Sequence, residues 1–420
     1  MKVLQLNVYN FRKGGSEAVF FNTIELLEMN GHKVSTFSLK WNNNLQSNYS
    51  RFFPDSKETR KGKLKPIKDI INYFYNFESA RKLEQLILEE KPDIAHVHLI
   101  WGQISSSILP VLKHHSIPII FSIHDYRIIC PAYTFKNGNN EICEKCEGNK
   151  FYNCISNKCT KDSYILSSMM ASEQYFRNIF FNPAKYIDGF IYVSSFAKKM
   201  HEKYMPQLKN KANVVLYNFA DEIVLSEKKS NGDKFFLYYG RLSHEKGLKT
   251  LIEAFALLDT CKLKIVGTGP LEEELIDFVE KRALRNIEFL GYKSGYELEN
   301  IVKNAYFIIV PSEWYENNPM TIVEGYSNAT PVIGASIGGI PEIIEDNKTG
   351  YLFKPKNVQE LVEVIKLANN LDPEDYRSFS FNALQFAKRY FNKQIYYQEL
   401  INFYKRLKYE NSNCRNERNS

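Results

Sequence analysis

Two glutamates flank an expected helix start in the second half of the chain. An apolar run that ends at Val310 predicts a strand, and Glu316 and Glu324 follow it with seven residues between them. Asn318 can cap a helix, and Pro319 suits its first position. Because a helix N-terminus presents unpaired backbone N–H groups and a partial positive charge, we expect this one to bind phosphate oxygens. The two carboxylates can accept hydrogen bonds from sugar or ribose hydroxyl groups without a metal ion.

Two cations form a second candidate site. Arg241 and Lys246 follow the apolar run Phe235–Tyr239, where a strand should end. A guanidinium and an ammonium group in such a turn can clamp a diphosphate. If that diphosphate leaves during a reaction, fixed cations stabilise its growing negative charge more in the transition state than in the ground state. Taken alone, each of these side chains is an ordinary surface charge, so the assignment depends on their arrangement along the chain.

The elements that must position these residues follow from the hydrophobic pattern. Short apolar runs alternate with segments of helical period, which is typical of α/β domains. The runs are continuous, as expected of parallel strands that are covered on both faces. We therefore predict doubly wound domains that bind ligands beyond the carboxyl ends of their strands, in a central cleft. The expected strands are Val3–Val8, Lys33–Phe37, Asp93–Val97, Ile117–Ile123, Phe190–Ser194, Val214–Tyr217, Phe235–Tyr239, Lys262–Val266, Ile287–Leu290, Ala305–Val310 and Pro331–Ile333.

The length of 420 residues suits two such domains. We place an N-terminal domain at 1–220 and a C-terminal domain at 234–392. The polar segment 221–233 between them predicts a linker. A helical pattern continues from Asp372 to about Lys408.

The composition is that of a soluble globular protein, with 44% hydrophobic residues, 25% charged residues and a net charge of +7. This charge suits acidic small molecules or lipid headgroups and is too small to indicate nucleic-acid binding. No apolar run is long enough to span a bilayer. Because Gln5, Asn7 and Asn10 interrupt the first apolar stretch, it predicts a strand rather than a signal peptide. We expect a cytoplasmic protein.

Other proteins with two α/β domains fit the sequence less well. A periplasmic-type binding protein would carry a signal peptide. A dehydrogenase would show G-x-G-x-x-G after its first strand, and the first turn here, Arg12–Glu17, reads RKGGSE instead.

The ordered motifs resemble those of a known family. Glu316 and Glu324 match the E-x7-E motif of the retaining family-four glycosyltransferases, which have the GT-B fold. Arg241 and Lys246 match the diphosphate-binding pair of that family. The resemblance covers nearly the whole chain, and the set of motifs carries it rather than any single turn. It implies two Rossmann-like domains that face a central cleft, and a last helix, here 393–410, that crosses back onto the N-terminal domain.

The same resemblance assigns further residues to the site. Gly14 and Gly15 correspond to a glycine loop near the acceptor and the donor phosphate, and His124 corresponds to the histidine beside the donor sugar. A buried structural histidine is the alternative for His124. Gly269 and Tyr292 lie in turns that match those around the nucleotide base.

Two more segments bear on the donor site. The Gly338–Glu342 turn matches a glycine turn beyond the donor. Asn317, Asn318 and Pro319 depart from the family, because many members have Phe-Gly or similar after the first glutamate. A phosphate site at the helix start survives this departure, but sugar selectivity can differ. A structural role is the expected one for His98, which lies near another strand end.

Five cysteines fall within an insert at 130–160 that has little apolar material. Cys143 and Cys146 form a C-x2-C pair, and Cys154 and Cys159 follow. Four thiolates at such spacing can surround a tetrahedral Zn²⁺, which would offset the entropy of ordering the loop. Free thiols and disulfides are the alternatives, and a reducing compartment disfavours disulfides. We predict a structural zinc site and no cofactor required for catalysis.

The segment 57–77 is basic and then aromatic. Such a segment can lie on an anionic membrane surface as a peripheral contact. The alternative is a solvated helix whose apolar face packs into the core.

The sequence therefore predicts a metal-independent, retaining hexosyltransferase. It would move a sugar from a nucleotide-sugar donor, expected to be a UDP-sugar, to a glycan or lipid-linked glycan acceptor in surface polysaccharide biosynthesis, at the inner face of the membrane. A non-catalytic sugar-nucleotide-binding or regulatory protein of the same fold is the alternative, and the intact Glu316, Arg241 and Lys246 argue against it. A phosphorylase-like or epimerase-like relative is a second enzyme alternative, and a phosphorylase would need pyridoxal phosphate.

Overall fold

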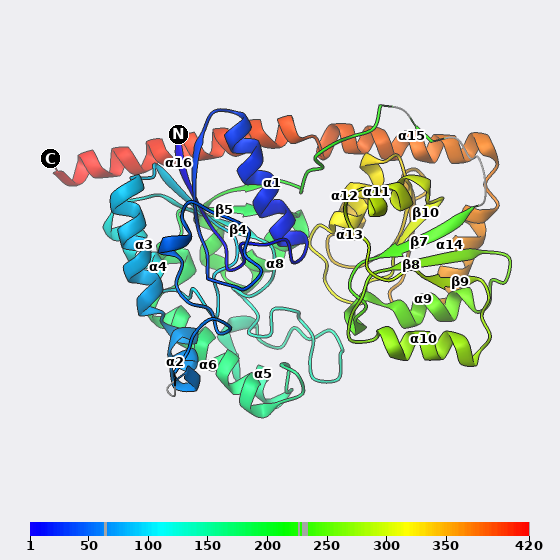
Figure 1. Ribbon diagram of the computed structural model, residues 1–420, viewed down its shortest axis with the longest axis horizontal. Helices are drawn as coiled ribbons and strands as arrows, with labels where there is room; N and C mark the ends of the chain where they lie inside the picture. The colour runs from blue at the N-terminus through cyan, green and yellow to red at the C-terminus, as the bar shows by residue number, and fades with distance from the viewer. Residues whose placement is uncertain (63–64, 226, 229–233, 420) are drawn as a thin grey trace. The chain divides into compact units, whose positions relative to one another are not determined.

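The computed structural model describes residues 1–62, 65–225, 227–228 and 234–419, with side chains described as far as residue 411. The chain forms two compact units (Figure 1): unit 1 comprises Met1–Leu216 and Tyr396–Ser420, and unit 2 comprises Tyr217–Ile395. Each unit contains a six-stranded parallel sheet with helices packed against it. The predicted pair of doubly wound α/β domains is thus confirmed.

The sheet of unit 1 has the strand order β2-β1-β3-β4-β5-β6. The chain builds from β1 to β2 on one side and then returns to add β3 on the other side of β1. This reversal makes the carboxyl ends of β1 and β3 a switch point, where ligands bind in folds of this kind. The strands are β1 (Lys2–Leu6), β2 (Lys33–Phe37), β3 (Ile94–Val97), β4 (Ile119–Ile123), β5 (Gly189–Tyr192) and β6 (Ala212–Val215).

The helices of unit 1 begin at polar caps in several places. The side chains of Asn76, Ser163 and Ser194 each accept a hydrogen bond from a backbone N–H in the first turn, which satisfies one of the donors left over at a helix start. The helices are α1 (Gly15–Met29), α2 (Lys65–Phe74), α3 (Phe77–Glu90), α4 (Ile108–His114), α5 (Tyr152–Ser156), α6 (Tyr164–Phe180), α7 (Pro183–Tyr186) and α8 (Ser195–Tyr204).

The sheet of unit 2 has the order β12-β11-β10-β7-β8-β9, so its switch point lies between β10 and β7. Its strands are β7 (Phe235–Tyr239), β8 (Lys262–Val266), β9 (Ile287–Phe289), β10 (Phe307–Val310), β11 (Val332–Ala335) and β12 (Gly350–Phe353). Its helices are α9 (Leu248–Phe255), α10 (Glu272–Lys281), α11 (Gly295–Asn304), α12 (Met320–Ser327), α13 (Ile340–Ile343), α14 (Val358–Asn369) and α15 (Pro373–Tyr390).

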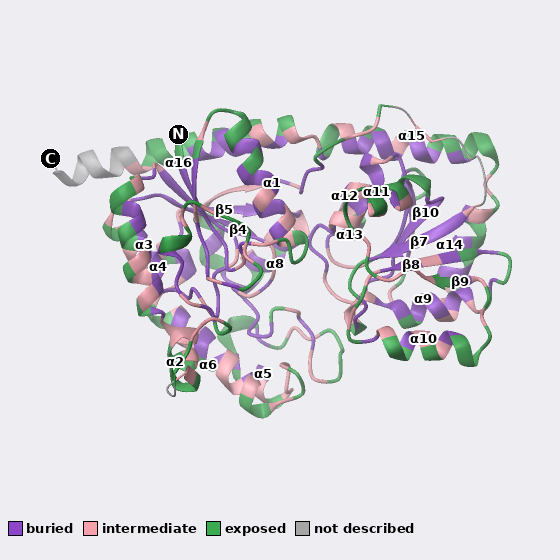
Figure 2. Ribbon diagram, viewed as in Figure 1, coloured by how far each residue is buried: buried purple, intermediate pink, exposed green. Residues whose placement is uncertain are grey.

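The strands form the centre of each core. Figure 2 shows most of the strands as buried, and all residues of β4, β7 and β10 are buried. Helices cover both faces of such strands, which explains why their sequences are continuously apolar. Among the described residues, no helix is long and apolar enough to cross a membrane.

The segment expected to link the domains lies partly outside the described residues, because 226 and 229–233 belong to it. Its described residues are bonded to unit 2. Val224 N donates to Ser327 O at 2.9 Å, and Lys228 Nζ donates to Ala305 O at 3.1 Å.

The last helix, α16 (Lys393–Asn419), returns to unit 1 as the resemblance implies. Lys408 Nζ pairs with Asp93 Oδ1 at 2.7 Å just before β3. Gly189 makes room for this helix, because a Cβ atom there would lie 2.5 Å from Leu407 Cδ1 and 2.7 Å from Phe403 Cζ. The contact therefore depends on a glycine at the start of β5.

Candidate active site

The predicted donor residues gather at the switch point of unit 2. Arg241 and Lys246 follow the carboxyl end of β7, and Glu316 follows the carboxyl end of β10. These strands are neighbours and run in parallel. Residues that the sequence places seventy positions apart therefore meet at one edge of the sheet, where ligands bind in doubly wound folds.

Backbone contacts lock the two loops together. Gly247 has φ +71°, and a Cβ atom there would lie 1.8 Å from Pro311 O, so no other residue fits this position without movement. Glu313 N donates to Glu245 O at 2.8 Å, and Thr250 Oγ1 donates to Glu313 Oε1 at 2.7 Å. These contacts fix the register between the loop after β7 and the loop after β10.

Glu316 is the centre of this arrangement. Its Oε1 accepts from Lys246 Nζ at 2.6 Å, from Trp314 Nε1 at 2.7 Å and from Ser312 Oγ at 2.8 Å. Its side chain is 8% exposed, against 26% for that of Lys246. Burial raises the pKa of Glu316, but the charge of Lys246 and the three hydrogen bonds outweigh burial, so the pKa lies below its ordinary value. Glu316 is therefore an anchored carboxylate.

The glycine turn after β11 supports Glu316 from behind. Gly338 has φ +64°, and a Cβ atom there would lie 2.3 Å from Glu316 O. Gly339 N donates to the same carbonyl oxygen at 2.7 Å. The sequence placed this turn beyond the donor site, whereas the structure shows that it holds the backbone of Glu316.

The turns after β7, β8 and β9 pack side by side. A Cβ atom on Gly269 would lie 2.3 Å from Leu242 O, and Gly267 N donates to Gly291 O at 2.8 Å. Arg241 projects from the first of these turns as an exposed side chain, and Tyr292 on the last is 70% exposed. The predicted nucleotide turns therefore line the same sheet edge as the two cations.

The predicted helix start is wrong by one residue. Helix α12 begins at Met320, and Pro319 occupies the cap position without a side-chain capping bond. Asn318 does not cap, because its Oδ1 accepts from Asn218 N and its backbone oxygen accepts from Asn218 Nδ2, both at 2.8 Å. Asn317 is buried beside Glu316 and is 8% exposed.

Glu324 lies in the second turn of α12, and its environment differs from that of Glu316. Its Oε2 accepts from Tyr239 Oη, at the end of β7, at 2.9 Å. Burial raises the pKa of Glu324 to about 6, and the charge of Asp221 acts in the same direction. Glu324 therefore titrates near pH 6, whereas Glu316 stays ionised.

In unit 1, a buried hydrogen-bonded chain links the predicted His124 to the C-terminal helix. His124 Nε2 lies 2.8 Å from His98 Nδ1, and His98 Nε2 lies 2.9 Å from Gln5 Oε1. Because a carbonyl oxygen only accepts, His98 donates through Nε2 and accepts at Nδ1 from His124. The Gln5 amide nitrogen donates to His96 Nδ1, which also accepts from Tyr404 Oη at 2.6 Å. This chain of hydrogen bonds holds His124 in one tautomer.

These histidines are neutral at physiological pH. Burial lowers the pKa of His124 to about 4 and that of His96 to about 3. Burial, with the neighbouring imidazoles, also lowers the pKa of His98 well below its ordinary value. His98, expected to be structural, is thus the direct partner of His124.

The segment that follows His124 is fixed by a buried network on α6. Arg177 is fully buried, and it donates to Arg127 O at 2.9 Å and to Glu173 Oε1 at 3.0 Å. Gln174, on the same helix, donates to Ile128 O. This network could not be predicted, because nothing local in the sequence distinguishes a buried arginine from an exposed one.

The glycine loop of unit 1 starts α1 as expected. Gly14 is at the cap position and Gly15 is the first residue of the helix. Glu17, which sequence reasoning missed, is 3% exposed and accepts from Ser16 Oγ at 3.1 Å. Burial raises the pKa of this carboxyl. An acidic residue in the first helical turn was the only signal in the sequence.

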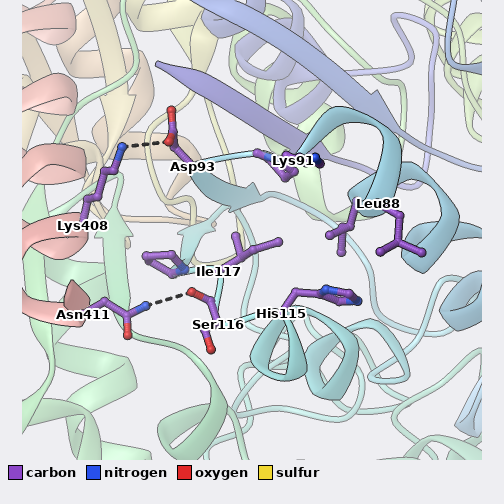
Figure 3. A pocket seen from close by; sticks show the side chains of 11 residues that line it. Leu88, Lys91, Asp93, His115, Ser116, Ile117, Lys408 and Asn411 are labelled. Carbon is purple, nitrogen blue, oxygen red and sulfur yellow. Dashed lines mark hydrogen bonds and ion pairs between the residues drawn. The ribbon is translucent and has the colours of Figure 1, made fainter. Parts of the chain in front are cut away.

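A separate hollow lies at the opposite edge of the same sheet. Figure 3 shows it between the start of β3 and residues 408–411 of α16, where Lys408 reaches Asp93 and Asn411 reaches Ser116. His98 and His124 follow the carboxyl ends of their strands, whereas this hollow lies at the amino ends. It is therefore distinct from the predicted site.

Two family models match the chain. The model described as Glycosyltransferase Family 4 matches residues 13–222, and the model described as Glycosyl transferases group 1 matches residues 220–386.

Relatives cover different shares of the chain. An uncharacterized glycosyltransferase of Methanocaldococcus jannaschii is 31% identical over 54% of this chain, which spans 62% of that relative. An uncharacterized 42.6 kDa protein in the cps region of Klebsiella pneumoniae is 23% identical over 93% of this chain and 100% of its own. O-antigen chain mannosyltransferase C of Escherichia coli is 34% identical over 33% of this chain and 38% of its own.

Solved structures share the two-domain fold. A glycosyltransferase from Rickettsia africae matches with a TM-score of 0.67 and 17% identity over 97% of this chain and 98% of its own. Anabaena HepE in complex with UDP and glucose matches with a TM-score of 0.63 and 17% identity over 96% of this chain and 98% of its own. These likenesses show the GT-B fold. Since the first family model spans half of the 420 residues, the chain belongs to glycosyltransferase family 4.

Proposed function

We propose that this protein is a metal-independent, retaining hexosyltransferase that moves a sugar from a nucleoside-diphosphate sugar to a glycan or lipid-linked glycan. The observation that carries the proposal is the ion pair of Lys246 and Glu316 at the switch point of unit 2, with the exposed Arg241 on the same loop as Lys246. Membership of the family supports the transfer of a sugar.

Arg241 and Lys246 supply the positive charge that the leaving diphosphate needs. An ammonium group carries three N–H donors, and Glu316 takes one from Lys246 at 2.6 Å, which leaves donors for phosphate oxygens. Charge that is already in place when the bond breaks costs no reorganisation, so it lowers the barrier directly. The two side chains and the start of α12 can thus do the work that a divalent cation does elsewhere.

The environment of Glu316 supports retention without a covalent intermediate. A nucleophilic carboxylate needs accessible lone pairs on the face opposite the leaving group. Glu316 is held by three donors on one oxygen, one of which is the ammonium group of Lys246. We therefore infer that the acceptor hydroxyl attacks from the face that the diphosphate leaves. The bond from the anomeric carbon to phosphate breaks, the bond to the acceptor forms, and the acceptor proton passes to the leaving phosphate oxygen.

We assign the remaining predicted residues by the same logic. Glu324 would accept ribose hydroxyl groups, and Tyr292 and Gly269 would border the base. His124, neutral and held in one tautomer by His98, would contact a sugar hydroxyl. Gly14 and Gly15, at the start of α1, would approach phosphate.

The names of relatives support the donor and acceptor classes. The Klebsiella relative lies in a cps region, and the Escherichia coli relative is an O-antigen chain mannosyltransferase. The Anabaena neighbour holds UDP and glucose. We therefore place this protein in surface polysaccharide biosynthesis with a UDP-sugar as the first donor to test.

We also propose that α2 binds an anionic membrane surface. None of its described residues is buried, and Ile67, Ile70 and Ile71 are 57%, 55% and 47% exposed. Lys61 and Lys68 are exposed nearby, whereas Lys63, also expected in this patch, lies outside the described residues. Apolar and basic side chains on one short helix suit the interface of acidic lipids. Wild-type protein should sediment with phosphatidylglycerol vesicles, and an Ile70→Asp/Ile71→Asp variant should not, while Leu367→Asp sediments normally. Equal sedimentation of all three would contradict this.

The function is tested by measuring donor turnover in variants that lack one of the two cationic side chains. Arg241→Ala and Lys246→Ala should each lower the rate of nucleoside diphosphate release by about 10²- to 10³-fold, because each removes a fixed charge from the leaving group. The donor for this assay is the nucleotide sugar that most raises the melting temperature of the wild-type protein.

Lys249→Ala is the matched control, because Lys249 is an exposed lysine on the following helix. It should keep wild-type turnover. Near-normal turnover in both site variants would remove these cations from the mechanism. Donor binding without turnover in the wild-type protein, with every acceptor fraction tried, would favour a non-catalytic binding protein.

A further inference from the structure

Two histidines and a glutamate meet where α3 packs against α4. Glu84 lies within α3, and His114 and His115 lie at the end of α4. One potential metal-ligand atom from each of the three side chains lies within 4.8 Å of the other two. Among the described residues, no other group of three or more histidine, cysteine, aspartate or glutamate side chains meets this condition.

The spacing between these side chains suits a metal ion. His115 Nε2 lies 3.4 Å from Glu84 Oε1. Two ligand atoms of a tetrahedral zinc ion are about 3.4 Å apart when the bonds are about 2.1 Å long. The rings of His114 and His115 meet edge to face, with their centroids 5.2 Å apart. Because Glu84 and His114 are exposed, small side-chain rotations can bring all three ligand atoms onto one ion.

Regular structure holds the backbone of the three residues. His115 N donates to Val111 O at 3.2 Å, which closes the last turn of α4. Glu84 follows Leu83, a fully buried residue that anchors this turn of α3. Ligands on packed helices are positioned more precisely than ligands on loops. The arrangement is therefore better suited to a metal ion than three side chains on mobile surface loops would be.

The lysines next to these residues in the sequence have other partners. Lys82 Nζ pairs with Glu78 Oε1 at 3.0 Å, and Lys113 Nζ pairs with Asp188 Oδ1 at 2.5 Å. Their ammonium groups are therefore engaged away from the Glu84 carboxylate. An ion pair between Glu84 and a protonated His115 is the simpler alternative, and it gives no role to His114.

We propose that Glu84, His114 and His115 bind one Zn²⁺, at a site that is independent of the proposed sugar transfer. Two imidazole nitrogens and one carboxylate oxygen are ligands that zinc takes in proteins. The imidazoles bind in their neutral form, so any extra proton that they carry passes to solvent when the ion binds. Three protein ligands leave the fourth tetrahedral position to a water molecule.

The ion would join α3 to α4 beside the hollow at the start of β3. His115 lines this hollow of about 400 Å³, as does Leu88, which lies four residues after Glu84 on α3 (Figure 3). The hollow lies at the amino ends of β3 and β4, whereas the predicted site lies at the carboxyl ends. A zinc ion here would stabilise unit 1 without contacting the sugar donor.

The cysteine insert does not show a comparable arrangement. Its cysteines are free thiols. Among the described residues, no three of their sulfur atoms lie within 4.8 Å of one another. The zinc site predicted from the sequence in this insert therefore stays a prediction, and any zinc bound there must be distinguished from zinc on the histidines.

Calorimetric titration of Zn²⁺ into the untagged, metal-depleted full chain tests the proposal. Wild-type protein should show a binding event whose affinity falls at least about 100-fold in Glu84→Gln, His114→Gln and His115→Gln, since the loss of even an outer-shell partner costs about 10- to 100-fold. Glu89→Gln is the matched control, because Glu89 is an exposed carboxylate on the same helix that pairs with Arg51. It should bind zinc as the wild type does.

Cobalt distinguishes this site from the thiols. The Co²⁺ spectrum of wild type minus that of His115→Gln should show weak visible bands without the intense near-ultraviolet absorption of thiolate ligands. Zinc should also raise the melting temperature of wild type and Glu89→Gln more than that of the three ligand variants. Unchanged zinc affinity in those variants, an equal loss in Glu89→Gln, or a difference spectrum with thiolate absorption would overturn the proposal.

Discussion

At the residue scale, the ion pair between Lys246 and Glu316 joins two motifs that lie seventy residues apart. The types and spacing of these residues could be recognised in the sequence, because each follows an apolar strand and belongs to an ordered set. Their contact could not, because it depends on β7 lying beside β10 and on Gly247 packing against Pro311. Both charged residues could be recognised in the sequence, but not the ion pair that they form.

Glu324 should make stability depend on pH in an identifiable way. Its folded pKa of about 6 exceeds the ordinary value of 4.5, so the protonated form is favoured in the fold. The contribution of the protonated Glu324 carboxyl to the free energy of unfolding is fully present below about pH 4.5 and is lost as the pH rises through about 6. Glu324→Gln keeps the neutral form at every pH. Relative to wild type, the variant should therefore gain up to about 2 kcal/mol between those limits in urea unfolding.

Glu316→Gln is the comparison with the opposite sign. The pKa of Glu316 is lowered, so its contribution is present above its unfolded pKa and is lost as the pH falls through the folded value. The loss in free energy of unfolding that Glu316→Gln causes, relative to wild type, should therefore shrink in acid. The gain that Glu324→Gln causes should shrink there too. Unfolding curves of Glu324→Gln that run parallel to wild type at all pH values would contradict the assignment.

At the element scale, the glycine turn after β11 should be essential to the site. Gly338→Ala places a Cβ atom 2.3 Å from Glu316 O at a φ of +64°, so the turn must move and displace Glu316. We expect a loss of about 2–4 kcal/mol in stability, from overpacking and backbone strain together. Turnover should fall with it, because a displaced Glu316 no longer holds Lys246. Thermal unfolding and initial rates measure the two effects.

Gly31→Ala is the control that measures the cost of backbone strain alone, without a steric clash. Gly31 has φ +78°, but no heavy atom lies within 4 Å of the added Cβ position. It should cost about 1–2 kcal/mol and leave turnover unchanged. If Gly338→Ala behaves like Gly31→Ala, the turn does not support Glu316.

Most elements could be predicted, and the exceptions have physical causes. Each of the eleven expected apolar runs overlaps a strand, since parallel strands buried on both faces have a strong hydrophobic signal. Strand β12, Gly350–Phe353, was missed. The start of α12 was misplaced because Asn318 bonds to Asn218, a hundred residues away, instead of capping.

At the scale of the whole molecule, pattern and length predicted two α/β domains, and the chain divides at Leu216 and again at Tyr396. The polar segment 221–233 suggested a later boundary. Its described residues pack on unit 2, where burial lowers the pKa of Lys228 to about 7. A polar sequence was therefore a poor guide to a free linker. The partners of α16 depend on tertiary contacts such as that of Tyr404 with His96, which no local pattern contains.

The proposed independence of a catalytic metal can be measured directly. Initial rates of transfer should be unchanged within minutes of adding EDTA, because Arg241, Lys246 and the start of α12 carry the charge. A slow loss that parallels unfolding would report on a structural metal. Rapid loss that Mg²⁺ or Mn²⁺ specifically restores would show that a divalent cation is required.

The stereochemistry of the first product distinguishes same-face transfer from inversion. The donor identified by thermal shift is incubated with enzyme, and proton NMR follows the anomeric signal of the transferred or hydrolysed sugar before mutarotation. We expect the product to keep the anomeric configuration of the donor, with no sugar adduct on Glu316 by intact-protein mass spectrometry. Product of inverted configuration, or a glycosyl adduct on a carboxylate, would contradict a same-face transfer supported by Arg241 and Lys246.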